Sequence, residues 1–539
     1  MLIMDCISTR IPYRQTNSFS KIVLNYIDQS EELKPFFAFP PTLQGIQKAI
    51  DARKKISSDR KLLVTELKKQ YAAVPVTDAV KKNIEVLLSE NTFTITTAHQ
   101  PNIFTGPLYF IYKILHAIKL SEHLKASLQK YNFVPVFYMG SEDADLDELG
   151  HTYIEGQKIK WEAKQTGAVG RMKVDKEFIK LIGLIEGQLS VQSYGKEIIS
   201  LVKDCYKEGA LIQDATFKLI NALFGEYGLI VLIPDNAELK RQMIPVFEDD
   251  LVNRTASGIV EKTVEKLQGA GYKAQANPRE INLFYLKDNI RERIVKQATR
   301  YKVQDSSISF TEEELKKELN ERPDGFSPNV ILRGIYQETI LPNIIYIGGG
   351  GELSYWLQLK GLFEHYKIPY PVLLLRNSFL IVEKKWQEKI SKLGFIIENF
   401  FLSEQELMNR LVVRESKQDV KLNGTLTDTE KLYETIKKHA TAIDSTLAQH
   451  VDALKAQSLH RLHELEKKML RAGKRKFADQ QRQIHAIKEK LFPANGLQER
   501  YDNFMSYYAK WGRAFIQKLY ENSLALEEEF VIIFDNGIT

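Results

Sequence analysis

Five short polar groups, each directly after an apolar run, contain the residue types used in acid–base chemistry and anion binding. They are His99-Gln100, residues 141–147, Asp235-Asn236, residues 348–352 and Arg376-Asn377. The apolar runs lack polar alternation, which is typical of strands in a parallel sheet covered on both faces. Ligands of such sheets bind outside the carboxyl ends of the strands. The sequence therefore predicts that the five groups lie along one edge and share a site.

The first group lies in the stretch TFTITTAHQPNIFTGPLYFIYKI, where a strand-like pattern gives way to a helix-like pattern. Gly106 and Pro107 suit the opening of a helix with Thr105 as its N-cap, and free amides in the first turn favour an anion. Lys113 could reach the same anion. The alternative is that His99 only hydrogen-bonds the turn and that Lys113 is solvated.

The second group, MGSEDADLDE, places five carboxylates within seven residues: Glu142, Asp143, Asp145, Asp147 and Glu148. Like charges this close cost free energy unless they are solvated or matched by a cation. A substrate ammonium, a magnesium ion or an arginine could supply the positive charge, and the spacing is not that of an EF-hand loop. A solvated acidic loop is the alternative, but the position after a strand favours a site.

Four successive glycines, residues 348–351 in YIGGGGELSYW, separate a strand-like run from a helix-like run. Glycine lets the backbone approach a ligand closely. The dinucleotide fingerprint fails because its third glycine would fall on Leu353 or Ser354, and no Walker lysine and hydroxyl follow. We interpret the segment as a close-approach loop, with a tight turn that binds nothing as the alternative.

Two arginine-containing segments are candidates for binding carboxylates. In RGIYQETILPN, one helical face could present Arg333, Gln337 and Glu338 together, and Arg376-Asn377 follows the last apolar run. Arginine forks bind carboxylates through two hydrogen bonds, which suits an acidic substrate. An internal salt bridge with the acidic group is the alternative.

Alternating strand and helix patterns must position these groups. Strand-like runs cover residues 92–98, 133–139, 228–233, 343–347 and 371–375, and helical patterns include residues 107–128 and 353–365. This alternation predicts an α/β fold with a Rossmann-like parallel sheet. Two inserted connecting segments, at about 151–225 and 250–330, are expected to wall the crevice.

A change of pattern near residue 428 predicts a second domain. Prolines disappear, and apolar residues recur every three or four positions up to residue 491, which indicates long amphipathic helices and a coiled coil. Thr446 with Gln449 resembles a capping box, so a turn near Asp444 could form a hairpin; one continuous helix is the alternative. We expect three parts: a core in 1–384, a helical coiled-coil domain in 385–496 and a C-terminal helix and tail in 497–539 that return to the core.

Composition limits the class of protein. The chain has 539 residues, of which 44% are hydrophobic and 27% charged, with a formal net charge of +6, which fits a globular protein of two or more domains. This small charge does not argue for a nucleic-acid partner, and no apolar run is long enough to span a membrane. The two cysteines, Cys6 and Cys205, lack metal-ligand spacing, so we expect no zinc site and a reducing cytoplasm.

The motifs together resemble one family. HQPNIFTGPLYFIYK, VPVFYMGSEDADLDE and RGIYQETILPNIIYIGGGGELSYWLQLK followed by LLLRNS are similar to the bacillithiol-biosynthesis cysteine-adding enzymes, a family of cysteine ligases, and the resemblance covers nearly the whole chain. It implies a Rossmann-like core, a coiled coil, a homodimer and a reaction that joins cysteine to glucosaminyl malate. The residues that match the family motifs are Gln100, Thr105, Gly106, Pro107, Tyr109, Glu142, Asp143, Asp145, Gly348, Gly350, Glu352 and Trp356.

Two departures from the family pattern affect the candidates. Family members often have histidine where this chain has Ala144, so a role for that histidine would be lost here. Many members also begin the first motif with Gly-Gln-Gln or Gly-His-Gln, whereas this chain has Ala98-His99-Gln100. Gln100 is thus a more secure candidate than His99.

The implied reaction needs activation of the cysteine carboxylate, because hydroxide is a poor leaving group. A nucleotide such as ATP, with magnesium, is the expected activating group. The sugar amine must attack unprotonated, which requires a general base; Asp143 or Glu142 would hold the cysteine ammonium or act as that base. The catalytic candidates are His99, Glu142, Asp143 and Asp145, and the candidates for the malate carboxylates are Lys113, Arg333 and Arg376.

Two other classes of protein remain open. One is a nucleotidyltransferase-like enzyme that acts on another small acid, since such folds also place a histidine turn at the N-terminus of a helix. The other is a non-catalytic scaffold in which the coiled coil is the working part.

Overall fold

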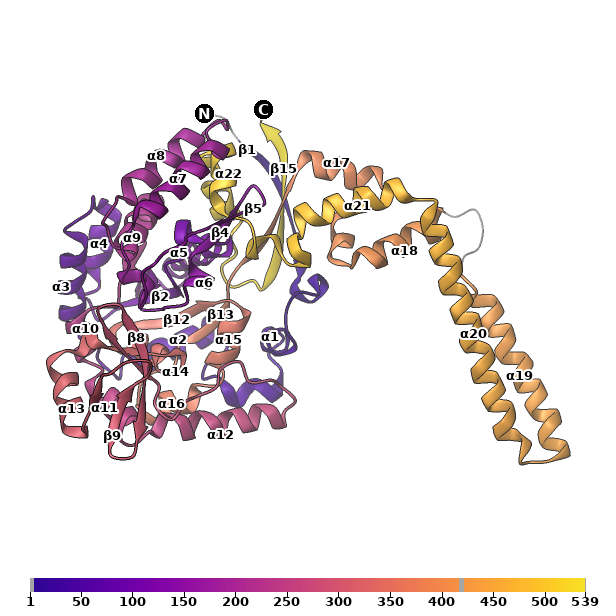
Figure 1. Ribbon diagram of the computed structural model, residues 1–539, viewed down its shortest axis with the longest axis horizontal. Coiled ribbons are helices and arrows are strands. Elements are labelled where there is room, and N and C mark those ends of the chain that lie inside the picture. The colour runs from indigo at the N-terminus through magenta and orange to yellow at the C-terminus, as the bar shows by residue number, and fades with distance from the viewer. Residues whose placement is uncertain (1–3, 416–420, 539) are drawn as a thin grey trace. The chain divides into compact units, whose positions relative to one another are not determined.

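The computed structural model describes residues 4–415 and 421–538, which divide into two compact units (Figure 1). The first unit comprises the described parts of residues 1–14, 18–381 and 497–539. The second comprises residues 15–17 and the described parts of residues 382–496.

A five-stranded parallel sheet forms the centre of the first unit. Its strands are β2 (Thr92–His99), β3 (Asn132–Met139), β6 (Ile230–Leu232), β12 (Asn343–Gly348) and β13 (Val372–Leu375), in the order β13-β12-β2-β3-β6. Every neighbouring pair is parallel. The strands are buried almost throughout, which explains their continuous apolar sequences. The predicted Rossmann-like core is confirmed.

One face of this sheet is covered by α2 (Leu43–Arg53) and α5 (Tyr109–Ser127). Phe93 and Ile95 of β2 point to the same face because they are two residues apart. They join a buried cluster with Ile46 and Ile50 of α2 and with Leu120 of α5. This packing holds α5 against the strand whose end carries His99.

The remaining elements of the first unit surround the parallel sheet. Its helices are α1 (Lys21–Ile27), α3 (Arg60–Tyr71), α4 (Asp78–Val86), α6 (Leu146–Leu149), α7 (Lys176–Leu189), α8 (Gly195–Cys205), α9 (Ile212–Phe224), α10 (Ala237–Arg241), α11 (Ile244–Val252), α12 (Thr255–Gly269), α13 (Glu312–Glu321), α14 (Val330–Ile340), α15 (Gly350–Trp356), α16 (Lys360–His365), α22 (Phe504–Trp511) and α23 (Arg513–Asn522).

The other strands form three further sheets. β4 (His151–Ile154) pairs with β5 (Gln157–Lys160), and a sheet of order β1-β15-β14 joins β1 (Met4–Pro12), β15 (Glu529–Ile538) and β14 (Ser378–Glu383). A five-stranded antiparallel sheet of order β10-β9-β8-β7-β11 contains β7 (Leu283–Lys287), β8 (Ile290–Gln297), β9 (Arg300–Val303), β10 (Ser309–Phe310) and β11 (Phe326–Pro328).

The second unit is helical and contains α17 (Lys384–Lys392), α18 (Glu404–Glu415), α19 (Asn423–Ile443), α20 (Leu447–Arg475) and α21 (Ala478–Leu491). Helices α19 and α20 pack against each other as a hairpin, with Lys437 Nζ 2.7 Å from Asp452 Oδ2. The hairpin interpretation is thus confirmed over the continuous helix. The capping box at Thr446 was wrong: Thr446 makes no side-chain cap, and Asp444 accepts hydrogen bonds from the Thr446 amide and hydroxyl.

Three searches of the described residues bear on ligand and membrane classes. None of their helices combines the length and apolar character needed to cross a membrane. No group of three or more His, Cys, Asp or Glu side chains among them could hold a metal ion. Cys205 is buried with a free thiol, whereas the side chain of Cys6 lies outside the described residues.

Candidate active site

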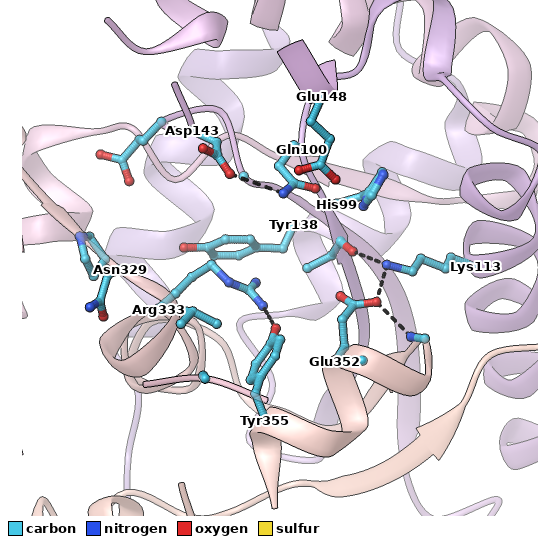
Figure 2. Close-up of a pocket in the computed structure, with 18 of the residues that line it drawn as sticks. His99, Gln100, Lys113, Tyr138, Asp143, Glu148, Asn329, Arg333, Glu352 and Tyr355 are labelled. Atoms are coloured by element: carbon cyan, nitrogen blue, oxygen red, sulfur yellow. Dashed lines mark hydrogen bonds and ion pairs between the residues drawn. The ribbon is translucent and has the colours of Figure 1, made fainter. Parts of the chain in front are cut away.

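A cavity of about 530 Å³ lies at the carboxyl edge of the parallel sheet. Each of the five strands delivers a residue to its wall at or just beyond the strand's end: His99, Gly140, Pro234, Gly349 and Arg376. The strands run parallel, so their ends converge there as the sequence predicted. Figure 2 shows side chains from these strand ends and from α14 and α15 turned toward one space.

Ten of the candidate residues line this cavity, and seven do not. Those in the wall are His99, Gln100, Tyr109, Lys113, Glu142, Asp143, Arg333, Gly350, Glu352 and Arg376. Those outside it are Thr105, Gly106, Asp145, Gln337, Gly348, Trp356 and Asn377.

Several of the residues outside the wall have clear structural contacts. Trp356 is fully buried and stacks on Phe363. The side chain of Asn377 accepts the Leu524 amide at 2.8 Å, and Asp145 accepts the Glu148 amide at the start of α6. Their conspicuous sequence motifs therefore also reflect packing and capping.

A second set of buried polar groups ties α14 to the sheet. Gln337 donates to Glu338 at 2.9 Å, and Glu338 is paired with Arg53 at 2.8 Å. Glu338 also accepts the amide of Asn343 at 2.7 Å. Gln337 and Glu338 thus hold α14 against the sheet and lie outside the cavity wall. Arg333 on the same helix lines the cavity.

The turn before α5 differs from the prediction. The helix begins at Tyr109, and Thr105 is not its N-cap: Thr105 has a φ of +69° and its hydroxyl has no hydrogen-bond partner among the described residues. The amide of Leu108 donates to the Asp502 carbonyl at 2.8 Å. Gly106 has a φ of +62°, and a side chain there would meet Asn102. The turn therefore needs its glycine for its own shape. The amides of Leu108, Phe110 and Ile111 are bonded within the protein, so they do not form the anion site that we expected.

Lys113 is buried and forms an ion pair with Glu352, which directly follows the four glycines. Its ammonium also donates to the Ala98 carbonyl at 2.9 Å. Glu352 accepts the Tyr346 hydroxyl and the Gly349 amide, each at 2.7 Å. Burial alone would raise the pKa of Glu352, but the Lys113 charge and these hydrogen bonds lower it to about 2. The glycine loop is thus held by its own carboxylate.

This carboxylate bears on whether the loop could cradle a nucleotide phosphate. The Gly349 amide is occupied by Glu352, and an ionised carboxylate beside the loop repels a phosphate. The glycine loop therefore does not fit a phosphate cradle, and its sequence also lacks the dinucleotide and Walker fingerprints.

Arg376 is also neutralised from within the protein. Its guanidinium lies 2.7 Å from the carboxylate of Glu499, and it donates to the Asn377 carbonyl and the Ser378 hydroxyl at 3.0 Å. Both charged side chains are almost fully buried. The internal salt bridge considered as the alternative is present, but its acid comes from residue 499 and not from the acidic group.

The acidic group divides between buried and cavity-facing carboxylates. Glu142 pairs with the fully buried Lys240, whose ammonium is also 3.3 Å from Asp235. Burial raises the pKa of Glu142 although the Lys240 charge opposes the rise. Asp143 accepts the Gln100 amide at 3.2 Å and lies 3.9 Å from Arg291. Glu142 is thus a fixed charge, and Asp143 is the more accessible of the two.

Arg333 is a cavity cation without a carboxylate partner among the described residues. Its guanidinium donates to the hydroxyls of Tyr355 and, at 3.4 Å, Tyr346, and it lies 5.9 Å from the Tyr138 ring centre. Within residues 4–415 and 421–538, no carboxylate lies within ion-pair distance of it. In Figure 2 it points toward the middle of the cavity. An arginine held by phenols in this way can still accept a bidentate anion.

His99 faces the same space as a neutral imidazole. Burial, together with the positive charges of Lys113, Arg376 and Arg333, lowers its pKa well below the usual value. Its Nε2 atom has no hydrogen-bond partner in the described part of the chain, and its ring stands edge-on to Tyr109 at 5.3 Å. His99 can therefore exchange a hydrogen bond with a ligand, but it adds no charge.

Sequence reasoning missed part of the wall. Tyr138, Gln275, Arg291, Asn329, Tyr355 and Arg500 line the cavity but were not candidates. Tyr138 lies inside an apolar strand, a position typical of a core residue. Tyr355 lies in the segment YIGGGGELSYW, in which the glycines were the evident signal. Arg291 and Arg500 come from segments with no pattern that points to a strand end, so only the folded chain brings them to the site.

Comparisons with known proteins agree over nearly the whole chain. A family model described as "Bacillithiol biosynthesis BshC, N-terminal Rossmann-like domain" matches residues 4–377, and one described as "Bacillithiol biosynthesis BshC, C-terminal coiled-coil domain" matches residues 379–534.

Individual relatives carry the same name, "Putative cysteine ligase BshC". The protein from Flavobacterium johnsoniae is 39% identical over 534 residues, covering 98% of this chain and 99% of its own. The Cytophaga hutchinsonii protein is 38% identical over 95% of this chain and 96% of its own, and the Salinibacter ruber protein is 27% identical over 95% of each. The chain therefore belongs to the BshC family of bacillithiol biosynthesis.

Proposed function

We propose that this protein is a ligase that joins the carboxyl group of cysteine to the amino group of glucosaminyl malate and so forms bacillithiol. The observation that carries the proposal is the division of charge in the cavity, with Arg333 uncompensated on one wall and Asp143 and Glu148 on the other. That layout is complementary to substrates that carry both carboxylates and an ammonium group. The names of the relatives support the same reaction class.

Arg333 is proposed to bind the malate carboxylates. Of the three cations considered from sequence, it is the one that remains available, because Lys113 and Arg376 already pair with Glu352 and Glu499. The Lys113–Glu352 and Arg376–Glu499 ion pairs instead make this part of the cavity wall rigid. Arg291 also lines the cavity, but its guanidinium lies 3.9 Å from Asp143, so part of its charge is already matched.

Asp143 is proposed to hold the substrate ammonium, and Glu148 to take the proton that the sugar amine loses before attack. Partial burial and the charges of Asp143 and Asp145 raise the pKa of Glu148, which makes it a stronger base than an ordinary glutamate. Glu142 is less suited to this step because its carboxylate is held by Lys240. His99 is proposed to hydrogen-bond the reacting carboxyl group from its free Nε2 atom.

Condensation of an amine with a carboxylate also requires that an oxygen leave. A nucleoside triphosphate would activate the cysteine carboxylate as an acyl phosphate or acyl adenylate, so that phosphate or AMP leaves in place of hydroxide. The amine then forms the new C–N bond and gives up its proton to the base. No residue of the glycine loop is assigned to the nucleotide.

The test is to incubate the protein with cysteine, glucosaminyl malate and each nucleoside triphosphate in turn, and to analyse the products by mass spectrometry. We expect a product whose mass equals the two substrates less one water, formed with one nucleotide and absent without protein. Nucleotide adducts of other acids without this product would favour the nucleotidyltransferase alternative. Absence of the condensed product with every nucleotide would refute the proposal.

We also propose that the second unit mediates a homodimer. Helix α19 has no buried residue, and the α19–α20 hairpin exposes Leu432, Ile443 and Leu465. A helical hairpin with this much apolar surface gains free energy by packing against another copy.

A further inference from the structure

Asp250 on α11 is a buried carboxylate that the proposed chemistry does not use. Its side chain is completely buried, and no cation in residues 4–415 or 421–538 lies within ion-pair distance of it. Its two oxygens accept the Asn282 backbone amide at 2.6 Å and the Asn282 side-chain amide at 3.0 Å. Burial raises the pKa of Asp250 to about 6 although these hydrogen bonds oppose the rise. A carboxylate buried without a cation costs free energy. The presence of Asp250 at this position therefore needs an explanation.

The side-chain amide of Asn282 can adopt only one orientation in this network of hydrogen bonds. Its Nδ2 group donates to Asp250 and to the Arg279 carbonyl at 2.9 Å, and its Oδ1 accepts the Arg279 amide at 3.1 Å and the Asn329 side chain at 3.0 Å. All four hydrogen-bonding positions of the amide are therefore used. Because an ionised carboxylate only accepts, Asp250 prevents the amide from flipping.

Asn329 connects this amide to the cavity. Asn282 directly precedes β7 and Asn329 directly follows β11, and the backbone amide of Asn329 donates to the Asn282 carbonyl at 2.9 Å. The Asn329 side chain caps α14 by accepting the Ile331 amide at 2.8 Å, and its carbonyl accepts the Arg333 amide at 2.9 Å. We call the hydrogen-bonded group of Asp250, Asn282 and Asn329 the Asn282 clamp. The first turn of α14, which carries Arg333, begins directly after this clamp.

We propose that Asp250 is a positioning residue: through Asn282 and Asn329 it fixes the start of α14 and so directs the guanidinium of Arg333 into the cavity. That the anion bound by Arg333 is the malate group rests on the proposed function. The positioning of Arg333 by Asp250, Asn282 and Asn329 does not depend on it. Arg333 has no carboxylate partner among the described residues and is held by the hydroxyls of Tyr346 and Tyr355, so its reach into the cavity also depends on where its helix begins.

The first test is a double-mutant cycle on the affinity for glucosaminyl malate, measured by isothermal titration calorimetry. Asp250→Asn keeps the size of the side chain but replaces one acceptor with a donor, and we expect it to weaken binding roughly tenfold, which corresponds to about 1.4 kcal/mol. In an Arg333→Ala background the same change should alter affinity less than about twofold. Equal losses in both backgrounds, or no loss in either, would overturn the proposal.

Asp249→Asn is the matched control. Asp249 lies on the same helix and accepts hydrogen bonds from Asn253, Thr255 and Tyr366, but it does not contact Asn282. It removes the same charge from the same helix, so it should leave the affinity unchanged. A tenfold loss in this control would show a general effect of α11 and would count against a specific clamp.

The second test needs no ligand, so it remains valid if the wild-type protein fails to bind glucosaminyl malate and the proposed function falls. Hydrogen exchange of the free protein, read by mass spectrometry at residues 329–334, should be faster in Asp250→Asn than in wild type and Asp249→Asn. Unchanged exchange would overturn the proposal. If Asp250→Asn does not fold, Asn329→Ser keeps a capping oxygen for Ile331 but loses the donor to Asn282, and the same outcomes apply.

Discussion

Replacing Lys113 with methionine would leave the carboxylate of Glu352 without its cation. The ammonium of Lys113 is almost fully buried, and the Glu352 side chain is 21% exposed. A fall in the pKa of Glu352 from 4.5 to about 2 corresponds to about 3 kcal/mol of stabilisation at neutral pH, since one pKa unit is worth about 1.4 kcal/mol. Lys113 supplies the largest favourable contribution, so Lys113→Met should lower the free energy of unfolding by about 2–3 kcal/mol.

The double variant Lys113→Met/Glu352→Gln separates this pair from other effects. It removes both charges and leaves no buried ion unpaired, so it should recover most of the lost stability. Urea unfolding followed by tryptophan fluorescence at pH 7 measures both variants. If Lys113→Met is as stable as wild type, or if the second substitution restores nothing, the ion pair does not hold the glycine loop.

The pH dependence gives an independent check on the same pair. The folded-state pKa of Glu352 is depressed, so the unfolded chain binds the proton more readily and the stabilisation is present above about pH 4.5. It should be lost as the pH falls from about 4.5 toward 2. In Lys113→Met this part of the acid loss should be absent, and a wild-type acid profile in that variant would contradict the assignment.

Three further predictions follow from the site and the helices. Glu148→Gln should lower kcat for bacillithiol formation and remove the rise in rate with pH that deprotonation of a raised-pKa base produces, as a pH–rate profile will show. His116 is buried, with a pKa lowered to about 4, so the stability advantage of wild type over His116→Gln should shrink as the pH falls from about 6.5 to 4 in urea unfolding, because the unfolded chain binds the proton first. Glutamate at Leu447 and Leu465 should dissociate the proposed dimer in light scattering, and a wild-type monomer at micromolar concentration would contradict the dimer.

The sequence was most informative where a local pattern determines the structure. Apolar runs predicted the parallel sheet, and the rule that ligands bind at strand ends brought His99, Glu142, Gly350 and Arg376 to one cavity. What it could not provide was the pairing of charges. Arg376 is neutralised by Glu499, which is distant in sequence, and neither residue's pattern indicates the other.

Backbone conformation was the second limit. Gly106 and Pro107 suggested the start of a helix, but the chain makes a turn with positive φ at residues 104–106 and begins the helix at Tyr109. Residues such as Arg291 reach the cavity through an antiparallel sheet whose strands have no strong alternation. Those positions depend on tertiary packing, which overrides local preference.

The central claim is that Arg333 binds the malate carboxylates of the sugar substrate in this cavity. The most direct measurement is the ratio of kcat/KM for glucosaminyl malate to that for an analogue lacking the malate carboxylates, in wild type and in Arg333→Ala. One charge-assisted hydrogen bond to a carboxylate is worth about 1.5–3 kcal/mol, or roughly tenfold to a hundredfold. Wild type should prefer the malate substrate by at least about tenfold, and Arg333→Ala should lose most of that preference while retaining its fold by circular dichroism. An unchanged preference in the variant would show that Arg333 does not bind the malate group and would contradict the account.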